Sequence, residues 1–152
     1  MEKTLEVLAL IVVGWVAGAE SGSWACVQPL VPRLSYEHQV ALEKGLLRTF
    51  GRVMPVLMPL GAILLGVLVV ASRDAPPIVF WLRVVAVAFV AITIVTTLTI
   101  NVPINVRTGR WEPSHDEREW TAMRARWRGF QGLRAVLLVV AFGLMVVATV
   151  LA

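Results

Sequence analysis

The stretch Ala135–Ala152 reads AVLLVVAFGLMVVATVLA and contains no charged side chain. A helix that crosses a bilayer needs about 20 mostly apolar residues, so this stretch with its flank predicts a membrane-spanning helix. Three further stretches are equally free of charge, namely Val7–Ala19, Val53–Ala71 and Val84–Ile100. The sequence therefore predicts an all-α integral membrane protein with four transmembrane helices.

The overall composition agrees with this interpretation. Hydrophobic residues make up 58% of the 152 residues and charged residues only 16%, with a mean hydropathy of +0.78. Soluble domains carry about 25% charged residues. We expect one four-helix bundle domain over residues 1–152, with spans at about 5–27, 53–72, 78–101 and 133–151.

The first apolar stretch also has some features of a secretory signal peptide. Its end, Ala17-Gly18-Ala19, is similar to a small-residue cleavage site. However, Glu2 and Glu6 accompany Lys3 in the leader, where a signal peptide has a basic region. We therefore expect this stretch to be the first helix of the bundle.

Several function classes are excluded by composition and motifs. The single cysteine, Cys26, allows no internal disulfide and no cysteine-rich zinc site. Neither a P-loop nor a dinucleotide-binding glycine motif occurs. The net charge of +4 does not indicate a nucleic-acid partner, because excess arginine in a membrane protein marks cytoplasmic loops.

Lysine and arginine are distributed unevenly between the two ends of the bundle. The two long inter-span segments hold most of them: Arg33, Lys44, Arg48, Arg52, Arg107, Arg110, Arg118, Arg124, Arg126 and Arg128. The opposite end offers Lys3 and Arg73, with Arg83 just inside the third span. The positive-inside rule predicts a multi-pass inner-membrane protein with cytoplasmic long loops and both termini extracytoplasmic.

The second and fourth helices are expected to extend beyond the membrane into the cytoplasm. Ser114-His115-Asp116-Glu117 fits a capping box and predicts that the fourth helix starts there. The second helix is expected to start at Ser35 and to continue through Pro55 and Pro59, which membrane helices tolerate. Pro103 is expected to end the third helix.

Glu20 is the most informative polar residue, because it lies within the first span. A carboxylate facing lipid is costly, so Glu20 should face the interior of the bundle, either protonated or paired. It could serve as a proton acceptor, metal ligand or substrate anchor. The alternative is a structural ion pair with Arg52, Arg83 or Arg134.

His38 is a second candidate for acid–base catalysis. It falls on the first turn of the second helix, on the predicted membrane side of Glu20, and imidazole exchanges protons near neutral pH. Glu20 and His38 could alternatively share a metal ion, with His115 as a third ligand. No motif indicates an organic cofactor.

The fourth helix presents an aromatic face. Trp120, Trp127 and Arg134 recur at steps of seven, with Gln131 alongside. This face is either packed core or the wall of a pocket for a hydrophobic small molecule. The predicted substrate-binding residues share a hydrogen-bonding or aromatic group on the cytoplasmic half of the bundle: Asn101, Asn105, Arg110, Trp127, Gln131 and Arg134.

Gly14, Gly18 and Gly22 form a stripe of small residues along the first helix. Such stripes allow close approach of helix backbones. The stripe predicts either a homo-oligomer contact or tight packing within the chain.

A run of residues in the second half of the chain resembles the anthrone-oxygenase-like family of small four-helix membrane proteins. The resemblance is carried by Asn101-Val-Pro-Ile-Asn105-x-x-Thr-Gly-Arg-Trp111, then Trp120, Arg124, Trp127, Phe130-Gln131 and Arg134, and by the segments Glu43–Pro55 and Gly18–Trp24. It implies an oxygenase that converts an electron-rich polycyclic aromatic to a quinone. Many members have a histidine just before the arginine that matches Arg134. This chain has Gln131-Gly132-Leu133 there, so it would need another base.

Chemistry on such a substrate requires a poised base, donors for the developing oxyanion and a dry apolar slot. Glu20 or His38 could be the base. Two other classes remain open, a small proton-coupled exporter and a non-catalytic membrane binding subunit. The long charged segments and the fixed orientation favour the oxidoreductase over the exporter.

Overall fold

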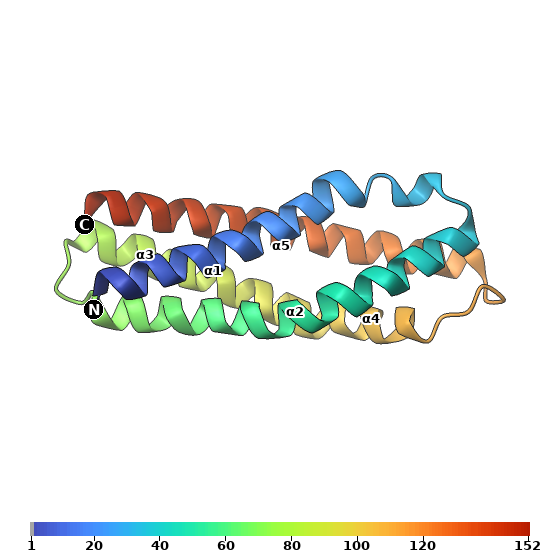
Figure 1. Ribbon diagram of the computed structural model, residues 1–152, viewed down its shortest axis with the longest axis horizontal. Helices are drawn as coiled ribbons and strands as arrows, with labels where there is room; N and C mark the ends of the chain where they lie inside the picture. The colour runs from blue at the N-terminus through green and yellow to red at the C-terminus, as the bar shows by residue number, and fades with distance from the viewer. Residues whose placement is uncertain (1) are drawn as a thin grey trace.

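The computed structural model describes residues 2–152 and forms an elongated antiparallel helix bundle (Figure 1). The α-helices are α1 (Glu2–Gly22), α2 (Tyr36–Ala71), α3 (Pro77–Thr96), α4 (Val102–Gly109) and α5 (Glu117–Leu151). Short π-helical or 3₁₀ segments complete the path: η1 (Ser23–Val27), η2 (Val31–Arg33) and η3 (Thr97–Asn101). The two chain ends and the α2–α3 connection lie at one end of the bundle, and the two longer connections lie at the other.

Within residues 2–152, four helical segments are long and apolar enough to cross a membrane, which confirms the predicted fold class. They are Lys3–Arg33, Tyr36–Ala71, Pro77–Gly109 and Glu117–Leu151. In their uncharged stretches the outward faces are apolar, with Ile11, Ile63 and Val95 among the exposed side chains. Helix α2 has 36 residues and would be about 54 Å long, which exceeds a hydrocarbon layer of about 30 Å. The side of the membrane on which the excess lies stays a prediction.

Two predicted helix boundaries are wrong. Helix α5 begins at Glu117 because Asp116 is its N-cap and accepts a hydrogen bond from the Arg118 backbone N–H at 2.9 Å. Residue Ser114 lies in the preceding turn. Pro103 does not end the third helical segment, which continues through the π-helical turn η3 into α4 with Pro103 near the start of α4. The start of α2 after Ser35 and its passage through Pro55 and Pro59 are confirmed.

The half of the bundle that holds the termini is tightly packed. Small side chains such as Ala9, Ala86 and Ala141 are fully buried in its core. A buried ion pair joins α1 to α3, with Arg83 donating to Glu6 Oε1 at 2.5 Å. The same oxygen accepts a hydrogen bond from Thr149 of α5. Three helices are therefore held together at this end.

A second cluster closes the opposite, loop end. It contains Val40, Trp111, Trp120 and Met123, with Tyr36 packed against it. The Trp111 indole N–H donates to the Tyr36 hydroxyl at 2.9 Å, and this hydroxyl donates to the His115 carbonyl. The region between the two clusters holds the candidate site.

Candidate functional site

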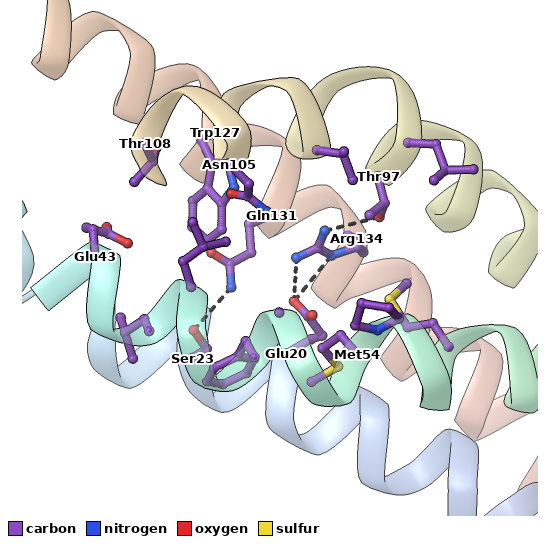
Figure 2. Close-up of a pocket in the computed structure, with 18 of the residues that line it drawn as sticks. Glu20, Ser23, Glu43, Met54, Thr97, Asn105, Thr108, Trp127, Gln131 and Arg134 are labelled. Carbon is purple, nitrogen blue, oxygen red and sulfur yellow. Dashed lines mark hydrogen bonds and ion pairs between the residues drawn. The ribbon is translucent and has the colours of Figure 1, made fainter. Parts of the chain in front are cut away.

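A cavity of about 250 Å³ lies between the two clusters and is lined by α1, η1 and the residue after it, α2, α5 and the α3–η3–α4 segment. Its apolar walls come largely from α2, with Leu47, Phe50, Met54 and Met58. The polar residues that line it are Glu20, Ser23, Gln28, Glu43, Thr97, Asn105, Thr108, Arg124, Trp127, Gln131 and Arg134. Figure 2 labels all of these except Gln28 and Arg124.

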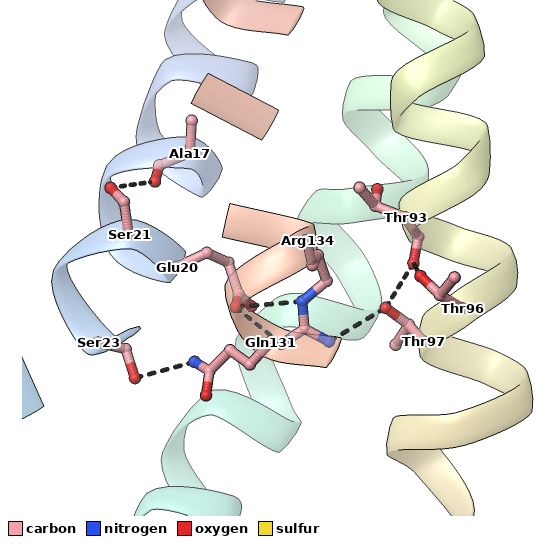
Figure 3. A network of polar contacts seen from close by, with 9 residues as sticks. All are labelled: Ala17, Glu20, Ser21, Ser23, Thr93, Thr96, Thr97, Gln131 and Arg134. Atoms are coloured by element: carbon pink, nitrogen blue, oxygen red, sulfur yellow. Dashed lines mark hydrogen bonds and ion pairs between the residues drawn. The ribbon is translucent and has the colours of Figure 1, made fainter. Parts of the chain in front are cut away.

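Glu20 lies inside the bundle, as predicted, and its partner is Arg134. Glu20 continues the buried stripe Val13–Val16–Ala17 of α1 at helical spacing, and only 2% of its surface is exposed. Arg134 donates from Nε at 3.2 Å and from a terminal nitrogen at 2.7 Å, both to Glu20 Oε2 (Figure 3). Its other terminal nitrogen donates to Thr97 Oγ1 at 3.1 Å.

This arrangement leaves one oxygen of Glu20 uncommitted. Within residues 2–152, Glu20 Oε1 accepts no hydrogen bond, whereas the three donating nitrogens of Arg134 are all used. The guanidinium therefore balances the charge of the carboxylate and fixes its orientation. The free oxygen is available to a molecule in the cavity.

Gln131 and Trp127 lie one and two turns from Arg134 on the same side of α5. Gln131 Nε2 donates to Ser23 Oγ at 3.2 Å, and its Oε1 is buried without a partner among the described residues. The indole N–H of Trp127 is likewise buried without an acceptor. Buried polar groups are nearly always satisfied, so these atoms indicate a site for a hydrogen-bonding occupant.

A second buried ion pair lies toward the loop end of the cavity. Arg124 approaches Glu43 Oε2 at 2.6 Å, and both side chains are at most 3% exposed. The guanidinium carbon of Arg124 lies 4.1 Å from the centroid of the Trp127 ring, within the range of a cation–π contact. Glu43 Oε1 and both amide atoms of Gln28 are buried without partners in the described structure.

Glu43, Arg124 and Gln28 were not among the predicted site residues. A signal for Glu43 exists in the sequence, because Glu43, Phe50, Met54 and Met58 follow one another at helical spacing on one face of α2. A carboxylate that begins an apolar stripe is a candidate for burial.

Comparison with known families agrees with the expected resemblance. The sequence model of the anthrone oxygenase family matches residues 47–144, more than half of the chain. The protein belongs to the anthrone oxygenase family. Among curated proteins and solved structures, no match to this chain is found.

The range matched in this anthrone oxygenase family member contains most of the cavity lining but not all of it. Asn105, Arg124, Trp127, Gln131 and Arg134 fall within residues 47–144. The carboxylates that pair with the two arginines come from outside the match, in α1 and the start of α2. The family match therefore covers both arginines of the ion pairs and neither glutamate.

The structure brings together Glu20, Asn105, Trp127, Gln131 and Arg134 of the predicted set around the cavity. Asn101 is fully buried, but it is not among the lining residues, and both its amide atoms lack partners in the described structure. Arg110 is exposed and also lies outside the cavity.

The expectation that His38 shares the site with Glu20 is wrong. His38 is exposed on the first turn of α2 and its Nδ1 is hydrogen-bonded with Ser35 Oγ at 2.6 Å. It lies two residues before the buried Val40 and so faces the opposite side of the helix. His115 is exposed in the α4–α5 connection. The structure thus brings neither histidine to the cavity beside Glu20, and no cluster of three or more metal-binding side chains occurs in residues 2–152.

Proposed function

We propose that this protein is a membrane-embedded oxygenase that oxidises a hydrophobic, polycyclic aromatic substrate of the anthrone type. The observation that carries the proposal is the free Oε1 of the buried Glu20 at an apolar cavity, in a member of the anthrone oxygenase family. A flat aromatic fits the apolar α2 wall and the Trp127 ring, and its carbonyl oxygen can meet a buried donor.

The proposed reaction begins with removal of a proton from the CH₂ group opposite the carbonyl of an anthrone. Glu20 Oε1 would accept this proton, and the electron pair left on the substrate moves into the rings and onto the carbonyl oxygen. The electron-rich anion then reacts with dioxygen. One oxygen atom becomes the new quinone carbonyl and the other leaves as water, so that O₂ is the only oxidant needed.

Other residues would stabilise the charge that develops during proton removal. The indole N–H of Trp127 is free to donate to the substrate oxyanion, and the amide of Asn105 also lines the cavity. Arg134 would act through Glu20, because its donating nitrogens are committed to Glu20 and Thr97. Arg134 is thus a positioning residue in this proposal.

The direct test uses purified protein in phospholipid nanodiscs, with anthrone as the substrate. We expect oxygen consumption and anthraquinone formation in a one-to-one ratio, well above the spontaneous oxidation measured with empty nanodiscs. Formation of anthraquinone at the spontaneous rate, with anthrone bound in the cavity, would contradict the proposed activity and favour a binding subunit. Accumulation of unchanged anthrone across sealed vesicles under a proton gradient would instead favour an exporter.

A further inference from the structure

The walls of the cavity differ in their exposure. The lining residues from α1, η1 and the chain just after it, Glu20, Ser23 and Gln28, are all buried. From α2 and the η3–α4 segment, five lining residues are exposed and all are uncharged and without polar side chains: Gly51, Pro55, Pro59, Leu98 and Val102. Leu98 is 62% exposed and Val102 is 39% exposed. The cavity is thus in contact with the molecular surface between α2 and η3–α4.

The two ends of the cavity along the bundle axis are filled. The packed core and the Glu6–Arg83 pair lie toward the termini, and the Trp111–Trp120 cluster lies toward the loops. The exposed lining residues lie within segments Tyr36–Ala71 and Pro77–Gly109, which are apolar enough to cross a membrane. Pro55, Pro59 and Leu98 also lie within the predicted spans 53–72 and 78–101, so we expect this part of the opening to face lipid rather than water.

Both helices beside this opening depart from regular α-helical hydrogen bonding. Pro55 and Pro59 remove the donors that would pair with the carbonyls four residues earlier, at Gly51 and Pro55. On the other side, the backbone forms the π-helical turn η3. Irregular helical segments of this kind bend more readily than continuous α-helix.

We propose that the gap bordered by Gly51, Pro55, Pro59, Leu98 and Val102, here called the lateral opening, is the route by which an apolar ligand passes between the bilayer and the cavity. This goes beyond the proposed function, because it concerns the path of the ligand and holds for any lipid-dissolved aromatic, whether or not it is oxidised. The apolar rim matches a ligand that partitions into the hydrocarbon layer before it binds.

The test follows a fluorinated benzophenone, a lipid-soluble diaryl ketone, in nanodiscs that contain the full-length protein. Fluorine NMR saturation transfer measures exchange between the bilayer and the cavity. Irradiation of the same samples reports occupancy through covalent adducts on peptides that contain the cavity residues Met54 and Met58.

Two variants each introduce a large side chain on one side of the lateral opening. Leu98→Trp narrows the opening from η3, and Gly51→Trp narrows it from α2, where an added Cβ meets only Leu47 at an ordinary 3.7 Å. The matched controls are Ile92→Trp on α3 and Gly45→Trp on α2, exposed positions that do not line the cavity. We expect each rim variant to slow exchange roughly tenfold or more, with adduct yield at equilibrium nearly unchanged, because bulk at the rim raises the barrier in both directions.

Wild-type exchange rates in the rim variants would overturn the lateral opening, as would an absence of adducts on the cavity peptides. Two rim variants on different helices keep the test valid if one of them fails to fold. Slowed exchange together with no anthrone oxidation would leave the lateral opening intact and remove the proposed oxygenase activity, so the two failures are distinguishable.

Discussion

Gly132 of α5 packs directly against the indole of Trp24 in η1. A Cβ added at Gly132 would lie 2.6 Å from Trp24 Nε1, closer than real Cβ atoms approach other heavy atoms. The neighbouring residues, Gln131 and Ser23, form the hydrogen bond that links the same two segments inside the cavity. The absence of a side chain at residue 132 therefore sets how closely η1 approaches the site.

We predict that Gly132→Ala destabilises the protein by about 1–3 kcal/mol, because the added methyl group forces the Trp24 ring or the η1 backbone to shift. Gly129→Ala is the matched control on the same helix, since a Cβ there meets no atom within 4 Å. The control should be neutral or stabilising by up to about 1 kcal/mol. Thermal unfolding in a mild detergent measures both, and equal midpoints would contradict the close packing.

Glu20→Gln should lower the rate of anthrone oxidation about 100-fold or more, because the amide cannot accept the substrate proton. The variant keeps the shape of the side chain and should fold. His38→Ala serves as the control and should retain the wild-type rate, since His38 is exposed and lies outside the cavity. Full turnover in Glu20→Gln would remove Glu20 as the base and leave Glu43 as the other cavity carboxylate to test.

Arg134→Leu should destabilise the bundle by about 3–5 kcal/mol, because it leaves the Glu20 carboxylate buried without its partner. The double variant Glu20→Leu/Arg134→Leu should be less destabilised than Arg134→Leu alone, since it removes both charges. Denaturation of the purified single and double variants supplies the comparison. A double variant as unstable as the sum of the two singles would show that the charges do not act as a pair.

Gln28→Leu separates a ligand-binding role from a structural one. Both amide atoms of Gln28 are buried and lack partners in the described structure, so their removal should leave the stability unchanged or increase it. If these atoms bind polar groups of the substrate, KM should rise about tenfold with kcat largely retained. Reduced stability together with an unchanged KM would assign Gln28 to the fold instead.

The orientation in the membrane is also testable. Both termini lie at the end of the bundle opposite the arginine-rich connections, so the positive-inside rule predicts an extracytoplasmic C-terminus (Figure 1). Alkaline phosphatase fused after Ala152 should be active, and green fluorescent protein at the same position should be dark. The reverse pattern would show that the protein has the opposite orientation, with the arginine-rich connections outside the cytoplasm.

The four helices could be predicted because a long uncharged run in a protein of this composition has few alternatives to a membrane-spanning helix. Glu20 was identifiable because a polar group within a predicted span must face the interior. Gln131 and Arg134 were identifiable because they share a helix face with Trp120 and Trp127. Glu43 and Arg124 were missed because they lie among the charges of the predicted cytoplasmic extensions, where burial depends on how α2 and α5 pack against each other. His38 was wrongly assigned because its membrane side could be predicted but its helix face could not.

The glycine stripe illustrates the same limit. A Cβ at Gly14 would lie 2.8 Å from the ring of Phe142, so this glycine serves packing within the chain. A Cβ at Gly18 or Gly22 meets nothing within 4 Å, and a contact with a second copy along these two positions stays a proposal. Spacing along one helix does not tell which of its glycines another helix will contact.

The ion pair between Glu6 and Arg83 has a consequence for alternating access. A transporter must expose its binding site to each side of the membrane in turn, which here would require α1, α3 and α5 to separate at the end that holds the termini. Separation would part this buried pair, free Thr149 from Glu6 and open the alanine-lined core. Opening the bundle at the end that holds the termini therefore costs free energy, and we predict that an occupant of the cavity leaves through the half of the membrane from which it entered.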